Sequence, residues 1–137
     1  MVFAISKALQ STITVEFAAK NGGNVPDWSK KVVFQLSQEE LAELCAFLFF
    51  PWKSVKWIHK SPSGITKALE LSMQSQKIIF TIKAGDRSIT VPVVARDQYF
   101  FRNLALSRLT EIQPPLHPDL QLASLQHLAE AHRTCKR

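Results

Sequence analysis

The sequence predicts a single α+β domain in which antiparallel β-strands form most of the core and a few helices pack against them. Several short runs alternate apolar and polar residues with a period of two, and polar turns such as "SPSG" and "AGDR" separate these runs. The spacings are too short for the crossover helices that parallel strands need. A length of 137 residues suits one domain, and an apolar fraction of 46% is typical of a globular protein.

The individual strands follow from this alternation. In "TITVEFA" the side chains of Ile13, Val15 and Phe17 share one face, as expected where one side of an antiparallel sheet is covered. In "SVKWIHK" every second residue from Val55 to His59 likewise shares a face. The predicted strands cover residues 12–18, 32–37, 54–60, 65–72, 77–83 and 88–94.

Three other segments have the spacing of helices. Ser37 is the expected N-cap of the first, because Glu40 three residues later completes a capping box. A Pro-Pro pair ends the second, and Pro118 begins the third, which packs either on its own domain or on a neighbouring subunit. The residues expected to face the core are Leu41, Leu44, Cys45 and Leu48 in the first helix, Phe100, Phe101, Leu104 and Leu109 in the second (residues 97–109), and Leu120, Leu125 and Leu128 in the third.

The Pro-rich segment around residues 113–118 is the one plausible hinge. We therefore expect residues 1–112 to form the main domain and residues 113–137 to form a C-terminal amphipathic helical extension. The sequence shows no signal peptide and no apolar run long enough to span a bilayer. Two cysteines in unrelated contexts fit a reducing interior better than a disulfide framework. These features predict a soluble, cytoplasmic protein, associated with the nucleoid if it is bacterial.

The sequence contains residues that can take part in catalysis, but not at the spacings that an active site or a metal site requires. Of the four histidines, His127 and His132 come closest to helical spacing, but they lie five apart and therefore on different faces. The chain has no phosphate-binding glycine loop, and the neighbours of Cys45 are apolar, which does not activate a thiol. We therefore expect no enzymatic activity, no cofactor, no metal and no small-molecule substrate.

The charge points to an anionic partner. Lysine and arginine number 17 against 11 acidic residues, which gives a formal net charge of +6. Many of the basic residues flank tryptophans on the predicted strands and loops. Single-stranded nucleic acid needs this mixture, because cations follow the phosphates and aromatic rings stack on unpaired bases. The alternative is that the lysines protect strand edges and that the aromatic residues belong to the core. Phe80 is expected in the core, Trp57 fits either interpretation, and Trp28 and Trp52 are expected to be exposed.

The order of the motifs resembles that of the Whirly family of single-stranded-DNA-binding proteins. Members have a strand ending in Phe-Ala, a loop with Asp-Trp-Ser and a basic residue, a strand, and a helix introduced by Leu-Ser; here these segments read "VEFAA", "DWSKK", "VVFQLS" and "QEELAEL". A strand ending in aromatic-His, a charged strand, a "S-V-P-V"-like strand and an aromatic helix follow, here "VKWIH", "ITKALEL", "ITVPV" and "DQYFFRNLAL". The resemblance covers about residues 12–109.

The resemblance implies two antiparallel sheets packed roughly at right angles with helices between them, and a homotetramer that holds single-stranded DNA along its sheets with little sequence preference. It places Trp28, Lys30 and Lys31 on the loop that leads into a strand of the binding groove. The region between the first strands is shorter than in plant-type members, which points to one reduced sheet. The residues predicted to bind nucleic acid are Trp28, Lys30, Lys31, Trp52, Lys53, Lys56, Trp57, His59, Lys60 and Lys67.

The predicted function is therefore single-stranded DNA binding with little sequence preference, in replication, recombination, repair or DNA transfer. The choice between DNA and RNA is left open. A double-stranded-DNA-binding transcription regulator is the first alternative, although no helix has the charge of a recognition helix. A protein-interaction scaffold is the second.

Overall fold

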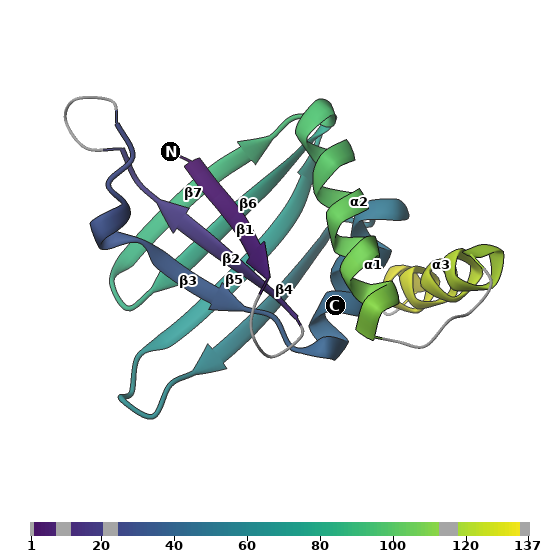
Figure 1. Ribbon diagram of the computed structural model, residues 1–137, viewed down its shortest axis with the longest axis horizontal. Helices are drawn as coiled ribbons and strands as arrows, with labels where there is room; N and C mark the ends of the chain where they lie inside the picture. Colours follow the sequence, from purple (N-terminus) through teal and green to yellow (C-terminus); the bar gives the residue numbers. More distant parts are fainter. Residues whose placement is uncertain (1, 8–11, 21–24, 113–117, 135–137) are drawn as a thin grey trace.

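The computed structural model describes residues 2–7, 12–20, 25–112 and 118–134. They form two antiparallel sheets and three α-helices, and the strands of the two sheets cross one another in Figure 1. The helices gather at one end of the molecule, and the strand hairpins project from the other (Figure 1). In chain order the elements are β1 (Val2–Lys7), β2 (Ile13–Ala18), the short 3-10 helix η1 (Trp28–Lys30), β3 (Val32–Gln35), α1 (Gln38–Phe49), β4 (Ser54–Lys60), β5 (Thr66–Gln74), β6 (Lys77–Ala84), β7 (Arg87–Val93), α2 (Ala95–Ile112) and α3 (Pro118–Thr134).

Both sheets are meanders of neighbouring strands. The first has the order β1-β2-β3 and the second the order β4-β5-β6-β7, so the prediction of an antiparallel α+β fold is confirmed. The first sheet is the smaller of the two. Its strand β1 was not predicted from the sequence; it pairs along its full length with β2, from Val2 opposite Ala18 to Lys7 opposite Ile13.

The core lies between the sheets and the helices. Alternation in β2 buries Ile13, Val15 and Phe17 completely, as predicted, and Phe80 on β6 is also fully buried. Helix α1 begins at the expected capping box, in which Ser37 Oγ accepts from the backbone N–H of Glu40 and Glu40 accepts from the N–H of Ser37. The four predicted core positions of α1 are all buried.

The prediction for the second helix was partly wrong. Helix α2 is longer than expected, and it turns Phe101, Ala105 and Leu109 to the core, positions that repeat every four residues. Phe100 and Leu104 each precede one of these positions, so the helix rotates them away, and they are 65% and 40% exposed.

Helix α3 packs on its own domain. It contacts α1, and its Leu125 and Ala129 are buried in the same hydrophobic core as the strands. Leu120 was expected to face the core but is 59% exposed, because it lies in the first turn, before the helix reaches α1. The C-terminal turn is held by Arg133, which donates to the carbonyl oxygens of Phe50 and Pro51.

Candidate nucleic-acid interface

The inner face of the second sheet changes character toward its hairpin end. Near the helices it is apolar, but its last inward row consists of His59, Lys67, Ala84 and Arg87, which are paired in this order across the four strands. Strand β3 and η1 lie over this row, and the first turn of α1 reaches it through Glu40. Three of the four side chains in this row, His59, Lys67 and Arg87, are basic, whereas the neighbouring inward row consists of buried apolar residues.

These side chains connect the second sheet to the first. Lys67 Nζ donates to the carbonyl oxygen of Val33 at 2.8 Å, and an Arg87 guanidinium N–H donates to the carbonyl oxygen of Lys30 at 2.7 Å. The imidazole of His59 stacks on the ring of Phe34, with 4.2 Å between ring centroids. Each contact ends on β3 or η1, so the row fixes the edge of the first sheet above the end of the second.

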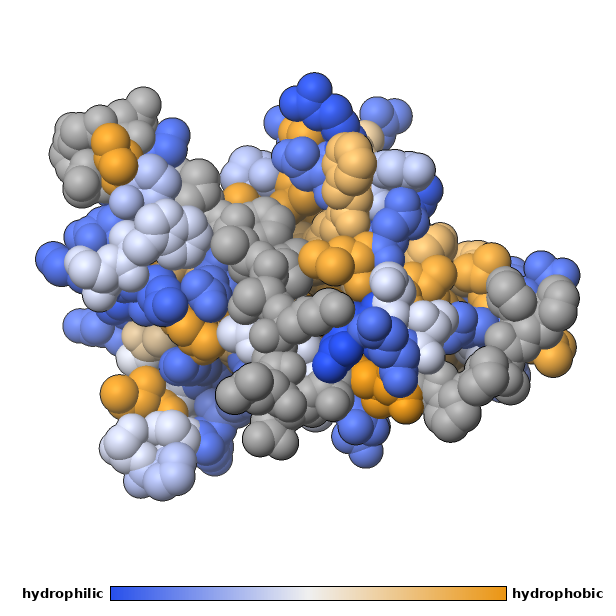
Figure 2. All heavy atoms as spheres, viewed as in Figure 1, coloured by the Kyte–Doolittle hydropathy of each residue, from blue (hydrophilic) through white to orange (hydrophobic). Residues whose placement is uncertain are grey.

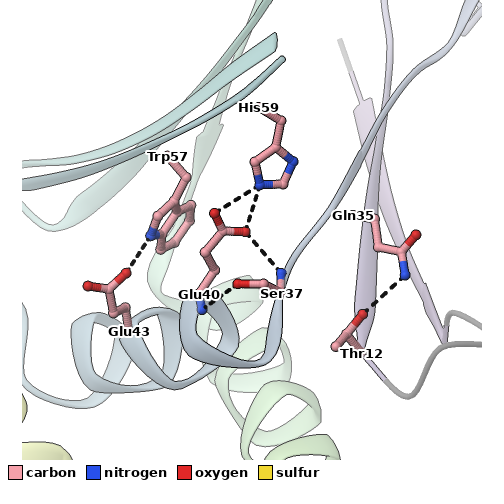
Figure 3. Close-up of polar contacts among 7 residues, drawn as sticks. All are labelled: Thr12, Gln35, Ser37, Glu40, Glu43, Trp57 and His59. Carbon is pink, nitrogen blue, oxygen red and sulfur yellow. Dashed lines mark hydrogen bonds and ion pairs between the residues drawn. The ribbon is translucent and has the colours of Figure 1, made fainter. Parts of the chain in front are cut away.

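Glu40 ties His59 to the start of α1. Its two carboxylate oxygens lie 2.8 and 2.9 Å from His59 Nε2, and one of them also accepts from the backbone N–H of Ser37 (Figure 3). One carboxylate thus completes the helix cap and orients the imidazole. Glu40 therefore positions the imidazole and the helix start, and we assign it no catalytic role.

A hollow of about 300 Å³ opens beside β3 at this end of the molecule. Phe34 is buried beneath His59, so the surface open to a base consists of the His59 imidazole and the exposed Ile65, and two lysines supply cations for phosphate. Gln35 adds an amide at the wall, held by a 3.4 Å contact between its Nε2 and Thr12 Oγ1 (Figure 3). The lining residues are Val33, Phe34, Gln35, His59, Lys60, Ser61, Ile65 and Lys67.

A second hollow, of about 210 Å³, lies at the other end of the same row. It is lined by Ala19, Lys20, Asp27, Lys30 and Arg87. Lys20 and Arg87 are not among the residues that the sequence motifs select. They lie 67 positions apart along the chain. The one sequence signal for Lys20 was its position directly after the segment "VEFAA".

Of the loop residues singled out by the sequence, Lys30 lines the second hollow, and Trp28 follows directly after Asp27, another residue of that lining. Trp28 and Lys30 belong to η1, and Trp28 is 40% exposed, so the prediction of exposure is confirmed. Lys31 is exposed as well, and its ammonium lies 3.4 Å from a carboxylate oxygen of Glu16.

The other two tryptophans are not available to a base. Trp57 is 5% exposed, and its Nε1–H donates to Glu43 at 2.8 Å, so the structure decides for the core (Figure 3). Trp52 was expected to be exposed, and that prediction is wrong. Its ring is half-buried, stacked on the imidazole of His132 with 4.5 Å between centroids and an interplanar angle of 7°, and in edge contact with Phe47.

The remaining predicted lysines lie away from the row. Lys56 is exposed on the outer face of the second sheet, where it shares a shallow depression with Glu70 and Lys83. Lys53 is exposed in the turn before β4. The structure therefore brings together Lys30, His59, Lys60 and Lys67 along the end of the sheet, but not Lys53 and Lys56.

Two other kinds of site find no support in the part of the chain that the structure describes. No group of three His, Cys, Asp or Glu side chains there could hold a metal ion. The thiol of Cys45 is buried, and burial raises its pKa to about 12, which leaves it protonated and unreactive. None of the described helices has the length and apolar character needed to cross a membrane.

The fold matches solved structures. WHY1 from Arabidopsis thaliana is 21% identical over 78% of this chain and 77% of its own, with a TM-score of 0.64. The chain has a Whirly fold. WHY3 from Arabidopsis thaliana (18% identity, TM-score 0.61, 90% of this chain and 74% of its own) and the plant transcriptional regulator PBF-2 (15%, 0.61, 92% and 70%) share the Whirly fold. No protein-family model and no curated protein matches the sequence.

Proposed function

We propose that the protein binds single-stranded DNA, with little sequence preference, along the hairpin end of its second sheet. The observation that carries the proposal is the row from His59 to Arg87, which has a hollow at each end, with the exposed η1 beside the second hollow. Bases enter the aromatic hollow or stack on the exposed Trp28, and the phosphates follow the rim lysines Lys30 and Lys60. The likeness to Whirly structures supports this use of the sheets.

Low sequence preference follows from the kind of contact. Ring faces and ammonium groups bind every base and every phosphate alike, so they add affinity without reading sequence. Gln35 is the one amide in the aromatic hollow that could read a base edge. We propose that the protein has no catalytic role. We further propose that it acts inside the cell in replication, recombination, repair or DNA transfer.

The exposed side of α2 supports self-association. Tyr99, Phe100 and Leu104 are 53%, 65% and 40% exposed. Figure 2 shows hydrophobic residues gathered over the helical end of the molecule. We propose that this stripe packs against copies of the same chain in a homotetramer, with residues 1–112 as the binding unit and residues 113–137 as a helical extension. Phe100→Ser should lower the mass measured by light scattering, whereas Gln126→Ser, at an exposed position of α3, should leave it unchanged.

The deciding experiment is fluorescence anisotropy with labelled oligo-dT at low and moderate salt, with a duplex of equal length as competitor. Tight, salt-sensitive binding that the duplex does not displace supports the proposal. Equal competition by the duplex would favour a double-stranded-DNA-binding regulator, which the likeness to the plant transcriptional regulator PBF-2 keeps as the second candidate. If neither DNA binds, a protein-interaction scaffold becomes the better explanation.

A further inference from the structure

The hollow around Lys20 is built differently from the aromatic one. Its walls are fixed by backbone contacts, because Lys20 and Pro26 form an isolated β-bridge and the N–H of Asp27 donates to the carbonyl oxygen of Ala19 at 3.0 Å. Arg87 closes the far side through its hydrogen bond to the carbonyl oxygen of Lys30. Among the described residues that line it there is no aromatic side chain. Its described walls therefore form a preformed polar site without a ring on which a base could stack.

The charge of this hollow is strongly one-sided. It has three cations, Lys20, Lys30 and Arg87, against one carboxylate, Asp27, a net charge of +2 from three positive charges and one negative. The carboxylate of Asp27 is already engaged, since its Oδ1 accepts from both the N–H and the hydroxyl of Ser29. Within the described residues, no ion pair involves the ammonium of Lys20 or Lys30. Two cations are thus unneutralised by the protein around them.

The pKa of Asp27 is consistent with this description. The hydrogen bond from the Ser29 hydroxyl lowers it most, and the charges of Lys30 and Arg87 lower it further. The carboxylate is therefore ionised at neutral pH, and its hydrogen bonds to Ser29 hold η1 in place.

The position relative to the aromatic hollow suggests a path for a strand. His59 and Arg87 stand at opposite ends of the inward row, three strand spacings or about 14 Å apart. A single strand that places a base in the aromatic hollow and follows the open end of the two sheets, outside the covered row, reaches the Lys20 hollow within a few nucleotides. Its phosphate then meets a site with a charge of +2.

We propose that the Lys20 hollow, lined by Lys20, Asp27, Lys30 and Arg87, binds the terminal phosphate monoester of a single strand. A terminal phosphate carries about −1.5 to −2 charges at neutral pH and three acceptor oxygens. An internal phosphodiester carries one negative charge and leaves one unit of the hollow's charge uncompensated. The inference rests on the proposed function and adds to it a preference for phosphorylated strand ends.

The test compares oligo-dT strands of about ten nucleotides that carry a dye at one end and, at the other end, a 5′-phosphate, a 3′-phosphate or the matching free hydroxyl. One phosphorylated end should bind about tenfold more tightly than the hydroxyl end, the factor that one hydrogen bond to a charged group provides. Its log-log salt slope should be steeper by about one unit. Inorganic phosphate should remove the preference while leaving binding of the hydroxyl-ended strand in place.

The decisive variant is Lys20→Ala, because the Lys20 side chain makes no contact on which the fold depends within the described residues. It should abolish the preference for the phosphorylated end, and Arg87→Gln should weaken it. The control Lys83→Ala removes the same charge from the outer face of the sheet and should keep the full preference. Equal affinities of wild-type protein for the phosphorylated and the hydroxyl-ended strands, or a preference that survives Lys20→Ala, would overturn the inference while the proposed function stands. Failure of every strand to bind would overturn both.

Discussion

The two tryptophans Trp28 and Trp57 provide a crossed test of which ring belongs to the core and which to the interface. Trp57 is 5% exposed and donates its indole N–H to Glu43 at 2.8 Å. Trp28 is 40% exposed on η1. Trp57→Phe should therefore lower the free energy of unfolding and leave the DNA affinity of the folded protein unchanged. Trp28→Ala should do the reverse.

The magnitudes follow from the contacts. Trp57→Phe deletes a hydrogen bond to a charged acceptor, worth about 1.5–3 kcal/mol, and part of a buried ring. Glu43 is 29% exposed, so water compensates some of its loss. A net cost of about 2 kcal/mol results. For 137 residues the entropy of unfolding is about 290 cal/mol/K, so the melting temperature should fall by about 7 °C.

The assays are thermal unfolding by circular dichroism and anisotropy with labelled oligo-dT. Loss of a stacked base at Trp28 should cost about 1–3 kcal/mol of binding, roughly 5-fold to 150-fold in Kd, with little change in melting temperature. The reasoning is refuted if Trp57→Phe weakens DNA binding without lowering the melting temperature. It is equally refuted if Trp28→Ala destabilises the fold and leaves Kd unchanged.

Three further changes test other parts of the molecule. Replacing both Lys30 and Lys31 with Ala should reduce the log-log salt slope of DNA binding by about one unit per lost phosphate contact, on all sequences alike, whereas Lys83→Ala should not change it. Glu43→Ala should lower the melting temperature by at least as much as Trp57→Phe, because its carboxylate accepts from a strand and faces a histidine of α3; Glu43→Gln, which keeps an acceptor, should recover part of the loss in the same melt. The raised pKa of Cys45 means that the folded chain keeps the thiol proton when the unfolded chain loses it, so stability is full below pH 9.0 and falls as pH rises toward 12. Urea unfolding across that range should show a shallower decline for Cys45→Ala than for wild type, and equal slopes would contradict the assignment.

Much of the fold could be predicted because its signals are local. Period-two alternation identified the buried face of β2, and the Ser37–Glu40 capping box located the start of α1 to the residue. The face of α2 was harder, since Tyr99, Phe100 and Phe101 are consecutive and hydrophobic all around the helix. Tertiary packing selected Phe101, whereas Phe100 beside it, which was also predicted to face the core, is exposed.

The site was only partly predictable for a different reason. A tryptophan beside a lysine in a strand has the same sequence pattern whether its ring faces the core or solvent, and only the folded structure shows that the ring of Trp57 is in the core. Trp52 could not be assigned locally because its partner His132 lies 80 residues further along the chain. The sequence could not predict that Lys20 and Arg87 line the same hollow either, because that depends on how the two sheets pack.

On the proposed function, a chain with a net charge of +6 would not use all its cations for binding. Lys67 and Arg87 donate to carbonyl oxygens of β3 and η1, so a share of their hydrogen-bonding capacity holds the first sheet over the second. Replacing either one would weaken DNA binding through movement of β3 as well as through lost charge. The rim lysines Lys30 and Lys60 have no such duty among the described residues, and for that reason their removal gives the cleaner measure of phosphate contact.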